Sequence, residues 1–243
     1  MLSEKYSFLL DKLLIDFSEE IRKENDVDLL KKKYALFVPQ IGLNYHKNKS
    51  LLVIGQAVNG WEPAWNIDEL KKDRENYLLQ SIEFAIEDKG KCSIEWVNDN
   101  WTAMHYPMYR SFFWNVTYKL VMKKYNLTET NWNNVIAYSN LMKISAAEGG
   151  NPNYAEQNAQ LKYSAKLLKQ EIEELQPKNV LIITNLKTWA APVLGAANIS
   201  YQCVAGEFLQ GRGNYKGSNI LITRRPFVGN HGRFVDEIAK ELV

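Results

Sequence analysis

The sequence predicts an α/β protein with a central, mainly parallel sheet of four strands. Four apolar runs of strand length support this prediction, at 51–54, 135–140, 181–185 and 220–223. Between the second and third runs lies one long amphipathic helix, which begins after Asn151-Pro152-Asn153 and stops at Pro177. A strand, helix and strand in this order form a right-handed parallel unit, so ligands are expected outside the carboxyl ends of these strands, where Asn140 and Asn185 stand.

The N-terminal half shows helical spacing around one strand. Leucine and phenylalanine repeat at helical intervals in residues 1–35, and we expect residues 1–50 to be a helical extension packed on a single domain that spans 1–243. The apolar run 51–54 opens into a Gly-bounded loop at Gly55. Residues 66–100 are charged and weakly periodic, which indicates a helix and a surface excursion.

The C-terminal half adds two more amphipathic patterns. A helix is predicted from Tyr109 onward, with Phe113, Val116, Leu120 and Val121 on its apolar face. The last strand is followed by a closing helix marked by residues 234, 238 and 242. The glycine-rich segment 206–217 is predicted to be a mobile loop.

Length and composition indicate one domain without a membrane span. The 243 residues are 46% hydrophobic, which suffices for one buried core, and no flexible linker divides them. No apolar run approaches the roughly 18 residues of a membrane helix, and the N-terminus lacks the apolar segment of a signal peptide. We expect a cytoplasmic protein with no membrane partner, and a monomer.

No cofactor or metal is expected. Cys92 and Cys203 are too few for an iron–sulfur cluster or a structural zinc site, and the three histidines lack the spacing that pairs imidazoles on one metal. No Gly-x-Gly-x-x-Gly follows a strand, and segment 206–217 lacks the Gly-Lys-Ser/Thr ending of a Walker loop.

Positive charge is concentrated near the C-terminus. The formal net charge is only +2, so the whole chain does not attract nucleic acid electrostatically. From residue 178 to residue 233, however, seven lysines and arginines stand against the single acid Glu207. This segment is either a phosphate-facing edge or a chance excess that acidic helices offset elsewhere.

Four segments, taken in order, resemble a known family. They are LVIGQAVNG at 52–60, a strand that ends in a short Gly loop; YPMYRSFFW at 106–114, an aromatic residue before a Phe-Trp pair; SNLMK at 139–143, a strand end followed by an Asn/Pro-rich turn and a helix; and RPF at 225–227, where the family has His-Pro-Ser. Over about residues 50–240 the chain is similar to the uracil-DNA glycosylase superfamily, most closely in layout to its iron–sulfur and mismatch-specific branches. The iron–sulfur cysteines are absent.

The resemblance implies a three-layer α/β/α sandwich and a function in DNA repair: hydrolysis of the N-glycosidic bond of a damaged or deaminated base by a DNA-binding glycosidase. Such an enzyme must flip the base, stack it, read its edge and place a water. Asn140 is expected to read the base, because an amide offers a donor and an acceptor side by side, and Tyr106 to stack on it. The alternatives are a loop-capping amide and a core aromatic.

The catalytic positions depart from the family. Ala57 replaces the Asp or Asn of the more active branches, which leaves Gln56 and Asn59 as amides that could orient a water but cannot accept its proton. Arg225 replaces the histidine, and it could stabilise an anionic leaving base or clamp a phosphate. The alternatives are loop amides and a solvated arginine pair.

Further residues are predicted to contact DNA. Phe227 could act as an apolar wedge, and His231 could occupy the space of the missing histidine. The predicted DNA-contacting set is Lys187, Arg212, Lys216, Arg224, Phe227, His231 and Arg233.

Three hypotheses therefore remain open at the level of sequence. The first is a DNA glycosylase. The second is a catalytically inactive protein of the same fold that binds nucleic acid, a free nucleobase or a nucleoside. The third is an unrelated Rossmann-like enzyme that acts on a small molecule.

Overall fold

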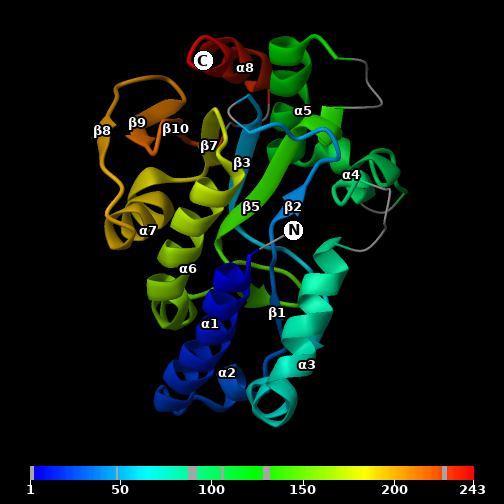
Figure 1. The fold of residues 1–243 in the computed structure, drawn as a ribbon, viewed down its shortest axis with the longest axis vertical. Coiled ribbons are helices and arrows are strands. Elements are labelled where there is room, and N and C mark those ends of the chain that lie inside the picture. The colour runs from blue at the N-terminus through cyan, green and yellow to red at the C-terminus, as the bar shows by residue number, and fades with distance from the viewer. Residues whose placement is uncertain (1–2, 48, 87–91, 105–106, 128–131, 226–228) are drawn as a thin grey trace.

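A mixed sheet of seven strands forms the centre of the molecule in the part of the chain that the structure describes (Figure 1). The structure is a computed structural model, and it describes residues 3–47, 49–86, 92–104, 107–127, 132–225 and 229–243. The strands of this sheet, in spatial order, are β2 (Gln40–Ile41), β5 (Ile136–Met142), β3 (Leu51–Ala57), β7 (Asn179–Ile183), β10 (Ser218–Thr223), β9 (Leu209–Tyr215) and β8 (Tyr201–Cys203).

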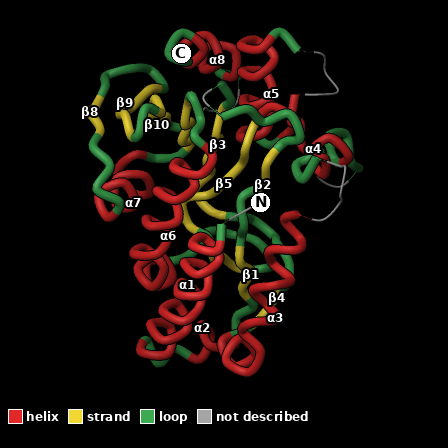
Figure 2. Tube along the Cα trace, in the orientation of Figure 1, coloured by secondary structure: helices red, strands yellow, loops and turns green. Residues whose placement is uncertain are grey.

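Helices surround this sheet, and a second, smaller sheet lies beside it (Figure 2). The helices are α1 (Glu4–Lys23), α2 (Val27–Lys31), α3 (Ile67–Ile86), α4 (Glu95–Asp99), α5 (Phe112–Tyr125), α6 (Tyr154–Leu175), α7 (Ala191–Ala196) and α8 (His231–Ala239), with short helical turns η1 (Met108–Arg110), η2 (Trp132–Val135) and η3 (Leu186–Ala190). The second sheet is antiparallel, in the order β4 (Ala64–Trp65), β1 (Tyr34–Leu36) and β6 (Ile144–Ala146).

The four predicted strands are adjacent and parallel in the middle of the large sheet. β3 pairs with β5 and with β7, and β7 pairs with β10, all in parallel register. The sheet has more strands than the four predicted, because antiparallel strands extend it on both sides. The two edge strands, β2 and β8, have only two and three residues, so neither leaves a recognisable apolar run.

The predicted mobile loop at 206–217 is largely a strand. β9 pairs with β10 along its whole length and with β8 on its other side. Gly211 and Gly213 occupy positions where a side chain would collide: a Cβ on Gly213 would lie 2.6 Å from the Ser200 carbonyl oxygen, and one on Gly211 would lie 3.1 Å from Ile222. The glycines therefore permit close packing, but they remove the apolar alternation that identifies a strand.

Alternating side chains of the parallel strands enter two separate cores. Leu51 and Val53 of β3 face one core, shared with α5 and α8, whereas Leu52 and Ile54 face the other, shared with α6 and α7. This alternation is the period of two that a strand imposes. Strands buried on both faces read as continuous apolar runs, which is why the sequence revealed them.

Helix α6 has the bounds and the apolar stripe that the sequence predicts. Its buried residues Ala165, Leu168 and Ile172 pack on the large sheet. Asn153 caps the helix: its side chain accepts a hydrogen bond from the Glu156 amide at 3.0 Å, and the Glu156 carboxylate accepts one from the Asn153 amide at 2.6 Å. This reciprocal capping box fixes where the helix begins.

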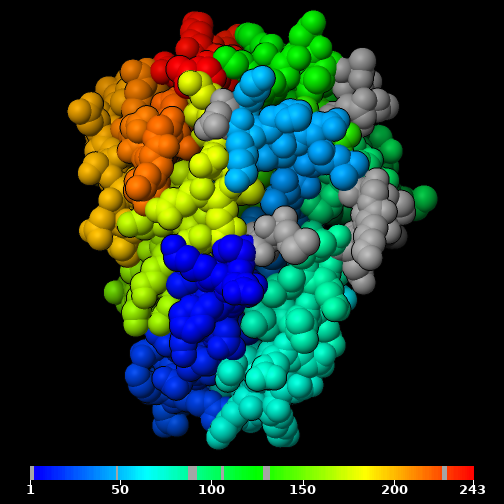
Figure 3. Space-filling model, viewed as in Figure 1, coloured from blue at the N-terminus to red at the C-terminus, as the bar shows by residue number. Residues whose placement is uncertain are grey.

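The described residues between 3 and 50 contribute strands as well as helices. α1 lies along α6 and α3, away from α5 and α8 (Figure 3). The chain then supplies β1 to the small sheet and β2 to the edge of the large one. No helix of the described residues, including α1, α3 and α6 with 20 or more residues each, is long and apolar enough to cross a membrane.

A buried ion pair holds the junction between the two sheets. Lys143 lies between β5 and β6, is fully buried, and donates hydrogen bonds to Glu171 of α6 at 2.5 Å, to Ser139 at 2.7 Å and to the Asn140 carbonyl at 2.7 Å. Glu171 also accepts from the Tyr6 hydroxyl of α1 at 2.6 Å and from Ser139. Burial lowers the pKa of the Lys143 ammonium, and the Glu171 carboxylate opposes that shift.

We predict that Lys143→Met destabilises the protein by about 3–5 kcal/mol, because Glu171 would keep an uncompensated buried charge. Adding Glu171→Leu should recover much of the loss, since two apolar side chains can replace a buried ion pair. Urea unfolding measures both. The control is Lys123→Met, which breaks the exposed Lys123–Asp236 pair and should change the free energy of unfolding by at most about 1 kcal/mol. Equal effects at the two lysines would contradict the prediction.

Candidate functional site

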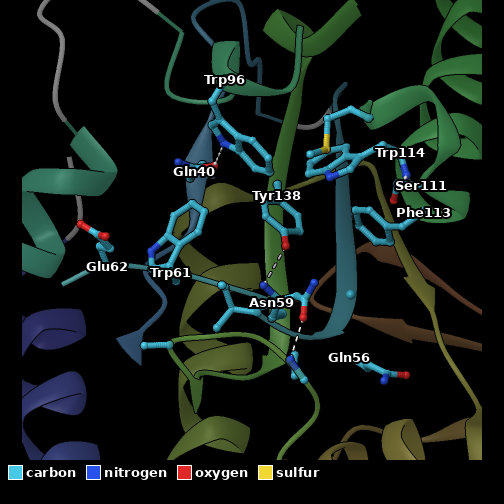
Figure 4. Close-up of a pocket in the computed structure, with 18 of the residues that line it drawn as sticks. Gln40, Gln56, Asn59, Trp61, Glu62, Trp96, Ser111, Phe113, Trp114 and Tyr138 are labelled. Atoms are coloured by element: carbon cyan, nitrogen blue, oxygen red, sulfur yellow. Dashed lines mark hydrogen bonds between the residues drawn. The ribbon is translucent and has the colours of Figure 1, made fainter. Parts of the chain in front are cut away.

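A cavity of about 1270 Å³ lies at the carboxyl ends of β3 and β5. One side of it is formed by the large sheet and the start of α5. The opposite side comes from the N-terminal part of the chain, through Lys33, Ala64 of β4 and Phe84 of α3. Its position matches the sheet edge where parallel strands usually place ligands. The residues drawn in Figure 4 surround a space walled largely by aromatic rings.

Asn140 lines this cavity, and its side-chain oxygen is buried next to Gly55 without a hydrogen-bond partner among the described residues. Its side chain is 1% exposed, and its Nδ2 donates to the Tyr138 hydroxyl at 3.0 Å. Its Oδ1 has no hydrogen-bond partner in the described part of the chain. Burial raises the pKa of Tyr138 to about 12, against the lowering effect of the Asn140 hydrogen bond, so the phenol is neutral. A buried amide oxygen without a partner costs free energy unless a ligand donor pairs with it.

Gly55 makes room for the Asn140 amide. β3 continues past Gly55 to Ala57, three residues beyond the end that the sequence predicted, and Gly55 pairs with Asn140 across the sheet. A Cβ at Gly55 would lie 2.5 Å from Asn140 Oδ1 and 3.5 Å from Phe113 Cε2. Glycine therefore allows the amide and the ring to approach the strand closely.

The predicted catalytic amides connect segments of the cavity wall. Gln56 Oε1 accepts from Thr184, after β7, at 3.0 Å, while its Nε2 donates to Asn151, before α6, at 2.6 Å. Asn59 Oδ1 accepts from the Gly150 amide at 2.7 Å. Each amide thus bonds to a distant segment rather than to its own loop.

Three of the four residues predicted to share a cleft do line this cavity: Gln56, Asn140 and Arg225. The fourth, Tyr106, lies outside the described residues, as does Phe227. Arg225 is exposed and is the second residue after β10. Its neighbour Arg224 is also exposed, and donates to the Gly206 carbonyl at 3.4 Å.

The predicted DNA-contacting residues do not form one continuous edge. Lys216 sits in the turn between β9 and β10, at the amino ends of the parallel strands, whereas Arg224 follows their carboxyl ends. Two of the arginines form ion pairs, Arg212 with Glu241 at 2.5 Å and Arg233 with Glu207 at 3.0 Å. Glu241 lies outside segment 178–233, so the charge of that segment did not reveal that Arg212 is paired.

The remaining members of that set have distinct surroundings. Lys187 is exposed on η3, after β7. His231 begins α8 and meets the Phe112 ring edge-on, with centroids 5.0 Å apart. Burial, together with Lys119, lowers the pKa of His231. Asn185 does not line the cavity, because its side chain caps η3 by accepting from the Thr188 amide at 3.1 Å.

The sequence did not identify the aromatic wall of the cavity. Trp61, Trp96, Trp114 and Phe113 lie around Tyr138 (Figure 4). Neighbouring rings meet mostly edge to face, with centroids 4.8 Å apart for Trp114 and Tyr138 and 5.9 Å apart for Trp61 and Trp96. Phe113 and Trp114 belong to the Phe-Trp pair that the sequence singled out, but the other rings come from separate segments, so nothing in the sequence joined them into one wall.

The sequence also did not identify four carboxylates that line the cavity. Glu62 and Glu148 come from loops, and Glu95 and Asp99 from the short helix α4. Loop residues have no periodicity, so only the fold brings these four together around one cavity.

No family model matches the chain, and no curated protein matches it.

Gly55→Ala should displace the Asn140 amide and destabilise the protein by about 1–3 kcal/mol, the range for overpacking a well-packed core. The matched control is Gly195→Ala in α7, where nothing lies within 4 Å of an added Cβ. That change should be neutral or stabilise by up to about 1 kcal/mol, because alanine favours a helix. Thermal unfolding distinguishes the two, and equal midpoints would contradict the close approach at Gly55.

Tyr138→Phe should cost about 1–3 kcal/mol, because it leaves the buried Asn140 amide without its hydrogen-bond partner. Tyr154→Phe is the control: Tyr154 is 80% exposed, so its change should stay within about 0.5 kcal/mol. Urea unfolding gives both values, and an unchanged midpoint for Tyr138→Phe would show that the hydrogen bond contributes nothing.

Proposed function

We propose that the cavity recognises a nucleobase, and that the protein is a uracil-DNA glycosylase-like protein to which DNA presents that base. The observation that carries this proposal is the Asn140 side chain. It is almost fully buried, lines the cavity and holds an acceptor oxygen without a partner. The N–H group on the edge of a base can supply the missing hydrogen bond.

The surroundings of Asn140 suit a flat heterocycle. Phe113 and Tyr138 both line the cavity, with ring centroids 5.5 Å apart, and Phe113 lies against the same Gly55 position as the amide. Stacking on an aromatic ring is worth about 1–3 kcal/mol per base. Phe113 is therefore our candidate for the stacking residue among those that the structure describes.

The architecture is compatible with this assignment. Four adjacent parallel strands lie at the centre of the sheet, with helices on both faces, and this α/β arrangement supports the proposal. Antiparallel strands extend the sheet at both edges.

A second candidate is recognition of the base without cleavage, and the state of Gln56 favours it. Both ends of this amide are bonded to other side chains, and Ala57 beside it carries no proton acceptor. Turnover would therefore lack the contribution of a general base at these two positions, which is about 10²–10⁴-fold in rate.

Labelled oligonucleotides that carry uracil, hypoxanthine, xanthine or a mismatch test the proposal, through binding and through formation of abasic sites. Preferential binding of at least one of them over an unmodified duplex is the expected result. Asn140→Leu should weaken this binding about 3-fold to 10-fold, the value of one hydrogen bond. Asn76→Leu, on the exposed surface of α3, is the control and should leave affinity unchanged. Binding that ignores the modified base would refute the proposal.

Excision of uracil should be slow or undetectable in the wild-type protein, because Ala57 and Arg225 replace the water-activating and leaving-group residues. Ala57→Asp should raise the rate at least about tenfold, since it restores a carboxylate at the end of β3. Single-turnover assays measure both proteins. Rapid excision by wild type that survives Arg225→Ala would place the chemistry on other residues.

A further inference from the structure

Resting on the proposed function, we infer that the base taken by this cavity is cationic, as in a purine alkylated on a ring nitrogen. Three independent features of the described lining support this inference: its charge, its aromatic wall and its unpaired buried atoms.

The charge of the lining is negative. It contains Glu62, Glu95, Asp99 and Glu148 against two cations, Lys33 and Arg225. Lys33 is already neutralised, because its Nζ bonds to both carboxylate oxygens of Glu69, at 2.6 and 2.5 Å. In the described part of the chain none of the four carboxylates forms an ion pair. An excess of unpaired carboxylates attracts a positive ligand.

These carboxylates give the cavity a negative charge, but they do not form a metal site. Among the described residues no three histidine, cysteine, aspartate or glutamate side chains gather closely enough to hold a metal ion. The Glu95 oxygens accept from the amides of Asn98 and Asn133, at 3.3 and 2.9 Å, and these neutral donors leave its negative charge uncompensated.

The aromatic wall is suited to a cation. Six rings that line the cavity follow one another in contact: Phe84, Trp61, Trp96, Trp114, Tyr138 and Phe113, with centroids between 4.8 and 5.9 Å apart. A cation over the face of an aromatic ring, tryptophan above all, gains about 0.5–2 kcal/mol beyond the apolar contact, which is about 2-fold to 30-fold in affinity.

The buried atoms without partners point to a ligand that carries both a donor and an acceptor. Asn140 Oδ1 lacks a donor, and Trp61 Nε1, on a side chain 9% exposed, lacks an acceptor. The Watson–Crick edge of an N7-alkylated guanine offers N–H groups and a carbonyl oxygen, and alkylation at N7 adds the positive charge without altering that edge.

A cationic base also fits the missing catalytic groups. When its C1′–N9 bond breaks, the bonding electrons pass to the positively charged ring, so that the base departs neutral. Water adds its oxygen to C1′ and releases one proton to the solvent. No histidine or other acid is then needed to stabilise an anionic leaving base, which fits a chain that lacks the family histidine at position 225.

The test compares N7-methylguanosine with guanosine by titration calorimetry, at mildly acidic pH where the methylated nucleoside is a cation. We expect the cation to bind at least about tenfold more tightly. Glu62→Gln combined with Glu148→Gln should reduce this preference about 3-fold to 10-fold, because two exposed charges are lost. Glu19→Gln, the same change on the exposed face of α1 outside the cavity, should leave it unchanged.

A second variant tests whether the aromatic rings of the cavity contribute to the preference for the cation. Phe84 is 43% exposed, so Phe84→Leu keeps an apolar side chain at little risk to the fold while it removes one aromatic face. It should lower the preference about 2-fold to 5-fold.

The outcomes separate this inference from the proposed function. Equal affinity for the two nucleosides, or a preference that none of the cavity variants changes, overturns the inference and leaves base recognition intact. Failure of both nucleosides and of all the modified oligonucleotides to bind overturns both proposals.

Discussion

The arrangement of this molecule depends on the buried ion pair between Lys143 and Glu171. The lysine stands where the chain leaves the large sheet and enters the small one, and the glutamate lies on the helix that crosses between β6 and β7. Through Tyr6 the same carboxylate secures α1 as well. A charge pair without solvent is tolerated only when every donor and acceptor is satisfied, and here the surrounding hydroxyl and carbonyl groups complete the network. It therefore fixes the geometry of two sheets and two helices at once.

The same network supports the candidate site. Lys143 donates a hydrogen bond to the Asn140 carbonyl and so holds the Asn140 backbone, while Tyr138 accepts a hydrogen bond from the Asn140 side chain and holds that side chain. A recognition residue must be held by its neighbours if it is to select a ligand by geometry. The N-terminal part of the chain then lines the cavity through Lys33 and Gln40, so the extension contributes to the site as well as to packing.

The sequence was informative where burial is strong and local. Strands buried on both faces appear as continuous apolar runs, and Asn153 and Pro177 mark the two ends of α6. Prediction failed where backbone packing replaces side-chain pattern, as at Gly211 and Gly213 of β9, and where strands are too short to show a period. Asn140, Gln56 and Arg225 could be placed at one sheet edge because parallel strands end together. The acidic and aromatic lining could not, because long-range contacts alone assemble it.

The short outer strands have a consequence for how this protein meets copies of itself. An open sheet exposes unpaired backbone amides and carbonyls at each border, and a long, flat border can template another chain. Here the borders are β2 and β8, with two and three residues, and β8 is mostly exposed and polar. Neither offers enough consecutive backbone groups for an added strand to register. A sheet that is apolar through its middle is thereby kept from growing into intermolecular β-structure.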